Sequence, residues 1–272
     1  MCSDGASGAG PFMIRALPYI GGGYIGLVLV FLYLPVAVMC VMAFNGSELY
    51  ALPITWSTKW FTALWTNERL IRASTNSLGL AFANTIVATS LGTLAALGLS
   101  RNEFPGKSLL RGLLLPPMAV PWLILGTSML VLFFWLGLGR GLHALLLGHV
   151  ALSLPYVIIV VSTRLAGHGV ELEEAAATLG AGAWLTFRRV TFPQIAPGII
   201  AAALFAFAIS LDQFVISYFL ASPGFQTLPV EIYTAIRKGF TPEINAIATL
   251  LIVISSALFL LVARFYRFGG ER

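Results

Sequence analysis

The charged residues with the greatest capacity for chemistry lie in one polar stretch, residues 171–197, with the sequence ELEEAAATLGAGAWLTFRRVTFPQIAP. In a chain with only 10% charged residues, this stretch holds three glutamates and two arginines: Glu171, Glu173, Glu174, Arg188 and Arg189. Charges at this density are too costly to bury in lipid. The stretch is therefore expected to lie in water beside the membrane, where it can meet a partner.

The same stretch has the pattern of two short helices joined by a turn. Its first nine residues are good helix formers. One small apolar stripe recurs at i, i+4, i+7 and i+11: Leu172, Ala176, Leu179 and Ala183. Gly180 and Gly182 break the first helix. Residues 183–190 can form a second, which Pro193 and Pro197 are expected to end. Two interpretations stand on physical grounds: an amphipathic helix-turn-helix that docks on a partner, and a solvated connector on the membrane surface.

The segments that resemble nucleotide-binding motifs lack the sequence context that such sites require, and no metal-binding motif is found. Residues 21–26, GGGYIG, match G-x-G-x-x-G but open an apolar span, whereas a dinucleotide site follows a strand. Gly106-Lys107-Ser108 resembles the end of a P-loop, but the first glycine of that motif would fall where Arg101 stands. The chain thus has no credible ATP site and no metal site of its own. The three histidines are scattered, which favours structural roles and argues against an enzyme: His143, His149 and His168.

Composition indicates a polytopic membrane protein. Apolar residues make up 58% of the 272 residues, well above the usual share in a soluble domain. The net charge of +5 would suggest nucleic acid in a soluble protein, but in this chain it fits basic cytoplasmic loops, so no nucleic-acid partner is expected. Six apolar segments are near the length that crosses a bilayer as a helix: about 20–44, 76–99, 109–136, 142–163, 198–220 and 245–266. We therefore expect an all-α fold of six transmembrane helices in contact with membrane lipid.

The loops between these segments predict the topology. Residues 45–75 form a loop rich in tryptophan, a residue that favours the membrane–water interface, and residues 222–243 form another loop on the same side. Ten Lys and Arg residues fall on the side of the termini and six on the other, which places both termini and the polar stretch in the cytoplasm. The expected division is a tail at 1–19, a six-helix transmembrane domain at 20–266 with its cytoplasmic loop at 165–197, and a tail at 267–272.

The polar stretch resembles the EAA loop of ABC importer permeases. That loop has the pattern E-A-A, three residues, G, nine residues, I, one residue, L-P. Here the matching residues are Glu174, Ala175, Ala176, Gly180, Val190, Phe192 and Pro193, with Val190 and Phe192 in place of Ile and Leu. The stretch also lies between the fourth and fifth of six expected spans, as in that family. The resemblance covers residues 19–266 and implies that the loop, with Glu171 at its start, is a coupling helix that fits a cleft of a cytoplasmic ATPase.

Further segments resemble the second permease of spermidine/putrescine importers. They are residues 210–219 (SLDQFVISYF), 227–233 (TLPVEIY) and 241–246 (TPEINA). Many members of that family have two consecutive acidic residues where this chain has Asp212-Gln213. Because of this departure, related cationic or amine-bearing solutes remain candidates together with polyamines. Because an intramembrane carboxylate is costly, Asp212 is expected to face the bundle interior, either lining a pore or in a buried structural pair. Gln213 and Tyr218 are the other candidate pore residues; an aromatic face such as that of Tyr218 can stabilise an ammonium group.

The resemblance implies an ATP-driven importer subunit of the bacterial inner membrane that works by alternating access and is not itself an enzyme. Its implied partners are two ATPase subunits that bind the ATP and Mg²⁺, a second and different permease, and an external solute-binding protein. The alternative is a stand-alone channel or ion-coupled carrier, which would need several intramembrane ionisable residues or internal repeats. Asp212 is the one strong candidate for such a residue, and no clear repeat is found.

Overall fold

The computed structural model describes residues 11–48, 52–114, 116–167, 169–238 and 242–269. In these ranges the chain is helical, and strand-like pairing is limited to an isolated bridge between Asn45 and Trp56. The expected all-α class is thus confirmed for this part of the chain. The helices are α1 (Pro11–Met42), α2 (Lys59–Leu64), α3 (Glu68–Arg101), α4 (Lys107–Leu113), α5 (Pro116–Ala119), α6 (Trp122–Trp135), α7 (Leu142–Ala166), α8 (Glu171–Thr178), α9 (Ala183–Thr186), the π-helix η1 (Phe187–Thr191), α10 (Phe192–Asp212), α11 (Val215–Leu220), α12 (Leu228–Lys238) and α13 (Glu243–Gly269).

The chain divides into two compact units, and the first comprises residues 1–66 and 240–262. It contains α1, whose apolar side chains are exposed along residues 24–41, as in a helix that faces lipid. After α1 the chain is anchored by Trp60, whose Nε1 donates a 2.7 Å hydrogen bond to the Asn45 carbonyl. Trp56 and Trp65 are exposed as expected of interfacial residues, whereas Trp60 is buried. Its indole therefore has a structural role.

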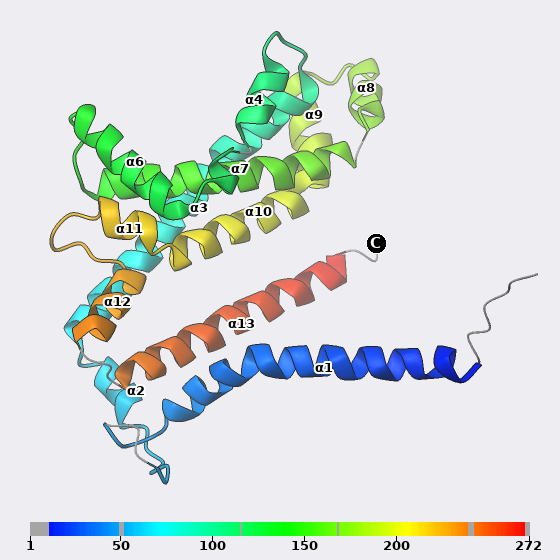
Figure 1. Cartoon of the computed structure of the whole chain (residues 1–272). Coiled ribbons are helices and arrows are strands. Elements are labelled where there is room, and N and C mark those ends of the chain that lie inside the picture. The colour runs from blue at the N-terminus through cyan, green and yellow to red at the C-terminus, as the bar shows by residue number, and fades with distance from the viewer. Residues whose placement is uncertain (1–10, 49–51, 115, 168, 239–241, 270–272) are drawn as a thin grey trace, which may run out of the picture. The chain divides into compact units, whose positions relative to one another are not determined.

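The second unit comprises residues 67–239 and the last residues of the chain, and its core is a bundle of α3, α7 and α10 (Figure 1). Buried Val157 and Val161 of α7 pack with Ala202 and Ala206 of α10 in one cluster. A Cβ added to Gly92 of α3 would lie 2.5 Å from Val157 Cγ1. Gly92 and Ala96 are both buried, and the lack of a side chain at Gly92 allows α3 to approach α7 closely.

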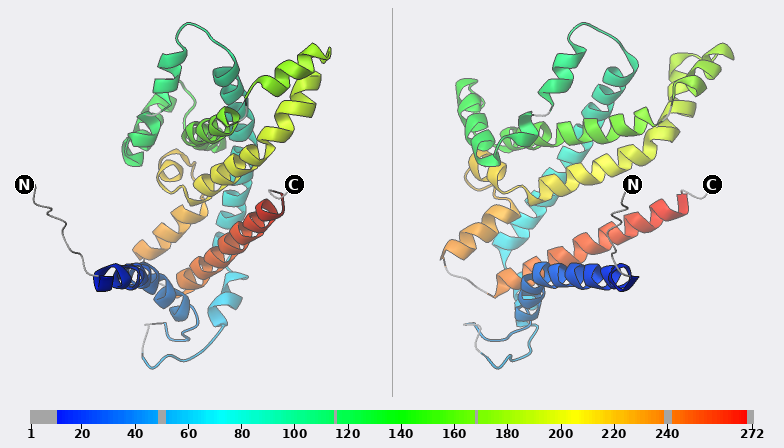
Figure 2. Two further views of the ribbon diagram at one scale, coloured as in Figure 1. Left: turned by 90° about the vertical axis from the view of Figure 1, so that its right-hand side faces the viewer. Right: turned by 45° about the vertical axis from the view of Figure 1, so that its right-hand side comes forward.

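The two ends of this bundle carry different elements (Figures 1 and 2). α4, α8 and α9 lie at one end, and α11 and α12 lie toward the other. Arg101 at the end of α3 and Arg164 near the end of α7 share the end of the bundle that carries α8. The polar stretch thus extends from the bundle of this unit at one end.

Among the described residues, four helices are long and apolar enough to cross a membrane: Gly21–Met42, Glu68–Arg101, Leu142–Ala166 and Ala183–Asp212. A fifth candidate is the pair Lys107–Ala119 and Trp122–Trp135, bent by 111°. Pro116, Pro117 and Pro121 account for that bend, as the sequence indicates. In the part of α13 with described side chains, Glu243–Ala257 is apolar but shorter. The described residues thus bear out a multi-pass helical protein and leave the count of six a prediction.

Several segments expected as loops or tails contain helices. Residues 45–75 are not all loop, because α2 and the first turns of α3 lie there. The Asn67 side chain caps α3 by accepting a hydrogen bond from the Leu70 N–H. The loop expected at 222–243 contains the amphipathic helix α12. In the tails, residues 11–19 belong to α1 and residues 267–269 to α13, and the ends 1–10 and 270–272 lie outside the described residues.

The helix expected to stop at Pro193 continues instead. α9, η1 and α10 form one helical run from Ala183 to Asp212, with Pro193 in the first turn of α10 and Pro197 inside it. In the wider π-turn, the Phe192 N–H donates to the Phe187 carbonyl five residues back. This turn accommodates Pro193, which has no N–H to donate. The expected fifth span therefore begins well before residue 198, and it ends at Asp212, since α11 is a separate short helix.

Candidate functional site

The helix α8 ends in the turn that the sequence predicts. Gly180 has φ +82°, a left-handed conformation that favours glycine. The Ala181 N–H donates to the Ala176 carbonyl at 3.0 Å and the Gly180 N–H to the Ala177 carbonyl at 2.9 Å. These two bonds make a Schellman motif, which satisfies the last carbonyls of the helix. The predicted break at Gly180 is confirmed, and its cause is this cap.

In the coupling role that the EAA resemblance implies, replacing Gly180 by valine is expected to distort the end of α8 and to lower ATP-driven uptake several-fold while ATP hydrolysis continues. A β-branched residue in the left-handed region costs about 1–2 kcal/mol. An added Cβ would meet nothing within 4 Å, so the effect comes from the backbone alone. Gly180→Asn is the matched control, because asparagine tolerates this conformation. Uptake and hydrolysis are measured together in vesicles, and equal uptake by both variants would contradict the role of the turn.

Glu173 fastens α8 to the bundle. Its Oε1 accepts a 2.9 Å hydrogen bond from Arg101 Nη2, at the end of α3, and another of 2.9 Å from Thr191 Oγ1, in η1. The side chains of Glu173 and Arg101 are each 22% exposed, so this ion pair is largely shielded from water. One carboxylate thus joins α8 to both α3 and the start of α10. The sequence prediction did not include Glu173 or Thr191 among the coupling residues and left Arg101 outside the span expected at 76–99.

The predicted apolar stripe of α8 does not face the bundle. Ala176 is half-buried, one turn after Glu173, so these two residues mark the inner side. Leu172 is 60% exposed and Leu179 89% exposed. A carboxylate with two polar partners, rather than leucine, holds the inner side. The i, i+3 spacing of Glu173 and Ala176 was the signal available in the sequence.

Most of the EAA residues lie on the surface. Within the described part of the chain, Ala176 and Val190 are half-buried and the others are exposed: Glu171, Glu174, Ala175, Gly180, Phe192 and Pro193. In α9, Trp184 is 71% exposed and stacks on Phe187, with ring centroids 5.8 Å apart. Large apolar side chains exposed beside carboxylates suit a protein partner better than water. This set, Leu172, Leu179 and Trp184, is called the outer face below.

The second candidate region is the break between α10 and α11. Asp212 is the last residue of α10 and is exposed, so the expectation that it faces the bundle interior is wrong for the single chain. Its neighbour Gln213 is buried instead, 1% exposed, and its Oε1 accepts from the N–H groups of Val215 and Ile216. Gln213 Nε2 is buried without a hydrogen-bond partner in the described structure. The helix end turns the glutamine inward, where it caps α11, and leaves the carboxylate outside.

His149 of α7 joins the two sides of this break. Its Nδ1 lies 2.8 Å from Ser210 Oγ of α10, and its Nε2 lies 3.1 Å from Ser217 Oγ of α11. Ser217 already donates its hydroxyl proton to the Gln213 carbonyl. The pattern is complete when neutral His149 donates from Nε2 and accepts at Nδ1 from Ser210. The structural role expected of His149 agrees with this geometry.

Tyr218 lies among other aromatic rings. Its ring centroid is 5.5 Å from that of Phe214, 5.6 Å from that of Phe219 and 6.0 Å from that of Tyr233 in α12. The side chain is nevertheless 43% exposed, so one part of it is open to a solute or a second subunit. Among the described residues, Asp212, Phe214 and Tyr218 thus present a carboxylate and aromatic faces within one short segment.

A family model and several known proteins are similar in sequence to this chain. The family model for the binding-protein-dependent transport system inner membrane component matches residues 88–269. The spermidine/putrescine transport system permease protein PotC of Escherichia coli (strain K12) is 36% identical over 237 residues, 86% of this chain and 89% of that protein. The putrescine transport system permease protein PotI of the same organism is 37% identical over 229 residues, 82% of each chain.

Solved structures share the fold. A chain of a bacterial ABC transporter involved in the import of the acidic polysaccharide alginate superimposes with a TM-score of 0.75 at 19% identity, covering 95% of this chain and 98% of that one. A chain of the MetNI methionine ABC transporter gives a TM-score of 0.61 at 18% identity, covering 76% and 97%. The family model over residues 88–269 and the identity to PotC and PotI place the chain in the family of binding-protein-dependent transport system inner membrane components.

Proposed function

We propose that this chain is the permease subunit of an ATP-driven ABC importer for polyamines or related cationic and amine-bearing solutes. The observation that carries the proposal is α8, which Glu173 fastens to the bundle on one side while Leu172 and Leu179 are exposed on the other. A helix presented in this way is suited to receive a push from a partner. The polyamine class is supported by the names of the relatives, PotC and PotI.

The contacts of α8 suggest how a push would travel. A partner ATPase that covers the outer face of one permease would move α8 as it binds ATP and Mg²⁺ and closes. The motion would pass through Glu173 to Arg101 and α3, and through Thr191 into α10. Because α3, α7 and α10 share one packed core, it would tilt the bundle and open the path alternately to each side.

The remaining assembly belongs to the same proposal. The bent pair α4–α6 and α13 complete six spans, with both termini in the cytoplasm of a bacterial inner membrane. Two ATPase subunits perform the hydrolysis, a second and different permease closes the solute path, and an external binding protein delivers the solute. The permease itself carries out no chemistry.

Uptake into vesicles tests this function. We expect radiolabelled putrescine or spermidine to accumulate only when the whole complex, binding protein and ATP are present. The second candidate is an ion-coupled carrier, favoured only by the exposed carboxylate of Asp212 at a helix break. Uptake driven by an ion gradient, in the absence of the ATPase subunits, would establish that alternative and overturn the proposal.

Replacing Asp212 by asparagine is expected to lower uptake of a cationic solute about fivefold, because one attractive charge contact at an exposed position contributes about 1 kcal/mol. The complex should assemble normally, because Asp212 is exposed and makes no ion pair within the described residues. Asp212→Glu is the control that keeps the charge. Initial uptake rates are compared at equal amounts of purified complex, and unchanged uptake by Asp212→Asn would remove the carboxylate from the solute path.

A further inference from the structure

A surface cavity of about 460 Å³ lies at the end of the bundle that carries α8, between the ends of α3 and α7 and the helix α4. Its polar lining combines two arginines with three hydroxyl side chains: Arg101, Arg111, Ser100, Ser162 and Thr163. The rest of the lining is mostly aliphatic. Both α3 and α7 are candidate membrane spans, so the cavity lies where apolar helices reach their charged ends. The aliphatic part of the lining can contact a hydrocarbon chain, and the part with the two arginines can contact an anion.

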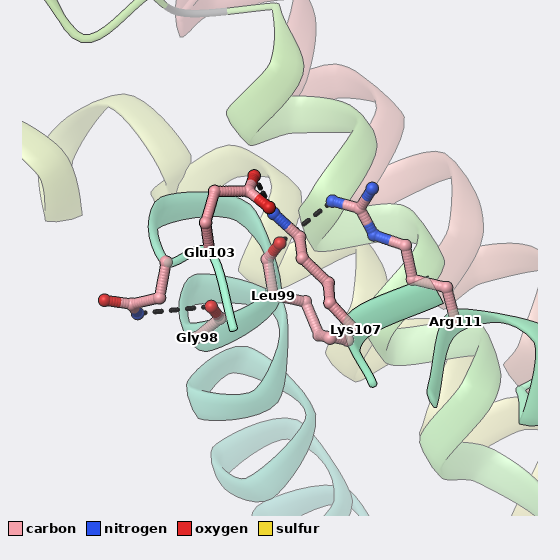
Figure 3. A network of polar contacts seen from close by, with 6 residues as sticks. Gly98, Leu99, Glu103, Lys107 and Arg111 are labelled. Atoms are coloured by element: carbon pink, nitrogen blue, oxygen red, sulfur yellow. Dashed lines mark hydrogen bonds and ion pairs between the residues drawn. The ribbon is translucent and has the colours of Figure 1, made fainter. Parts of the chain in front are cut away.

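The cationic groups of the cavity have unused hydrogen-bonding capacity. Arg101 donates one Nη to Glu173, while its buried Nε has no partner in the described structure. Arg111 donates from Nη2 to the Leu99 carbonyl at 2.9 Å, and no carboxylate among the described residues lies within ion-pair distance (Figure 3). A guanidinium offers five N–H donors, so most of those of Arg111 remain available for an anion.

The neighbouring lysine does not contribute to this charge. Lys107 Nζ contacts Glu103 Oε1 at 2.6 Å (Figure 3). The hydrogen bond and charge of Lys107 hold the pKa of the Glu103 carboxyl below its usual range, so this pair stays ionised and mutually neutral near pH 7. The excess positive charge at the α3–α4 turn therefore belongs to Arg111.

We propose that this cavity binds the phosphate headgroup of an anionic phospholipid. Guanidinium groups bind phosphate oxygens with paired donors, and the hydroxyl of Ser162 supplies a further donor. The hydroxyl of Thr163 donates to the Ile159 carbonyl at 2.8 Å and is not counted among these donors. The aliphatic lining suits the upper part of an acyl chain. A cationic solute is excluded by the two arginines. The inference rests on the proposed function in assigning this end of the bundle to the cytoplasmic leaflet, where basic pockets between transmembrane helices bind such headgroups.

The site also links the lipid to α8. Arg101 lines the cavity and at the same time holds Glu173, the residue that fastens α8. A headgroup that contacts Arg101 fixes the guanidinium in place and thereby strengthens the attachment of α8 to α3. Transport is therefore expected to depend on anionic lipid through this cavity.

Lipid binding is tested on the purified whole complex by native mass spectrometry after exchange into vesicles of phosphatidylcholine with one-fifth phosphatidylglycerol. The wild type is expected to retain phosphatidylglycerol. Arg111→Gln should retain about fivefold less, the order expected for one basic residue at an anionic surface. Ser162→Leu should lose the lipid by filling the cavity without a change in charge. Arg140→Gln, an exposed arginine outside the cavity, is the matched control and should retain it.

Two further arms separate the sources of phosphate. Inorganic phosphate and soluble glycerophosphoglycerol are added to complexes in pure phosphatidylcholine, and stimulation of uptake and of ATP hydrolysis is compared with that by phosphatidylglycerol. Stimulation by the lipid alone, lost in Arg111→Gln and kept in Arg140→Gln, is the expected result. Equal stimulation by inorganic phosphate, or equal lipid retention by all variants, would overturn the proposal.

The lipid measurement does not depend on transport. A complex that retains phosphatidylglycerol through Arg111 but takes up solute without ATP would refute the proposed function and leave the lipid site standing. A complex that transports with ATP but retains no lipid would do the reverse.

Discussion

Replacing Glu173 by alanine is expected to abolish most ATP-driven uptake while the ATPase subunits remain bound and continue to hydrolyse ATP. The change removes both hydrogen bonds that fasten α8, one from Arg101 and one from Thr191. It also leaves the guanidinium of Arg101, 22% exposed, without its carboxylate. A hydrogen bond to a charged group contributes about 1.5–3 kcal/mol, so the ratio of attached to detached α8 should fall roughly tenfold to a hundredfold. Hydrogen exchange of the α8 amides and solute uptake are measured on the same reconstituted complex.

The control for Glu173 is its neighbour Glu174, which is exposed on the same helix. Glu174→Ala makes the same change in charge but leaves α8 attached, so it should weaken ATPase binding without a rise in hydrogen exchange. A double-mutant cycle between Glu173 and Arg101 should give a coupling free energy above about 1 kcal/mol. If α8 exchanges at the wild-type rate in Glu173→Ala, the ion pair does not fasten the helix and this account of coupling fails.

The sequence predicted those parts of the site that depend on local physics. Gly180 is an example, because a helix cap needs only a few consecutive residues and a left-handed glycine. The pair of Glu173 and Arg101 could not be found in this way, since 72 residues separate them and only the packing of the helices brings them together. Helical spacing alone gives an apolar stripe on α8 but does not say which side of the helix faces the bundle, and the long-range ion pair fixes that orientation.

Prediction of the two ends of the fifth span failed for a related reason. Pro193 is a strong local signal for a helix end, yet a single π-turn keeps the run from Ala183 to Asp212 continuous. At the other end, α10 stops at Asp212, although the residues from Phe214 onward are apolar enough to continue a membrane-spanning helix. The break is stabilised from outside the segment and by its own Gln213 cap: His149, on another helix, bonds serines on both sides of it. Such a contact has no signature in the segment itself, which is why Asp212 was expected inside.

Replacing His149 by leucine is expected to have a large effect on stability. The imidazole is 1% exposed, and its two nitrogens lie near Ser210 Oγ and Ser217 Oγ. Leucine would fill much of the space but leave two buried hydroxyls with fewer partners, at a cost of about 1–3 kcal/mol. Ser217 keeps its bond to the Gln213 carbonyl, so Ser210 accounts for the greater part of that loss. We expect a lower unfolding temperature of the purified complex.

The matched control lies on the same helix. His143 is exposed, and its Nε2 contacts the Leu138 carbonyl at 2.7 Å, so His143→Leu breaks one hydrogen bond that water can replace. Its unfolding temperature should stay near that of the wild type. If His149→Leu shifts the temperature no more than His143→Leu, the serines find other partners and His149 does not hold the break. A large shift confined to His149→Leu, together with loss of uptake at temperatures where the protein remains folded, would mean that transport requires a fixed angle between α10 and α11. Solute uptake would then depend on a residue that is buried away from the solute.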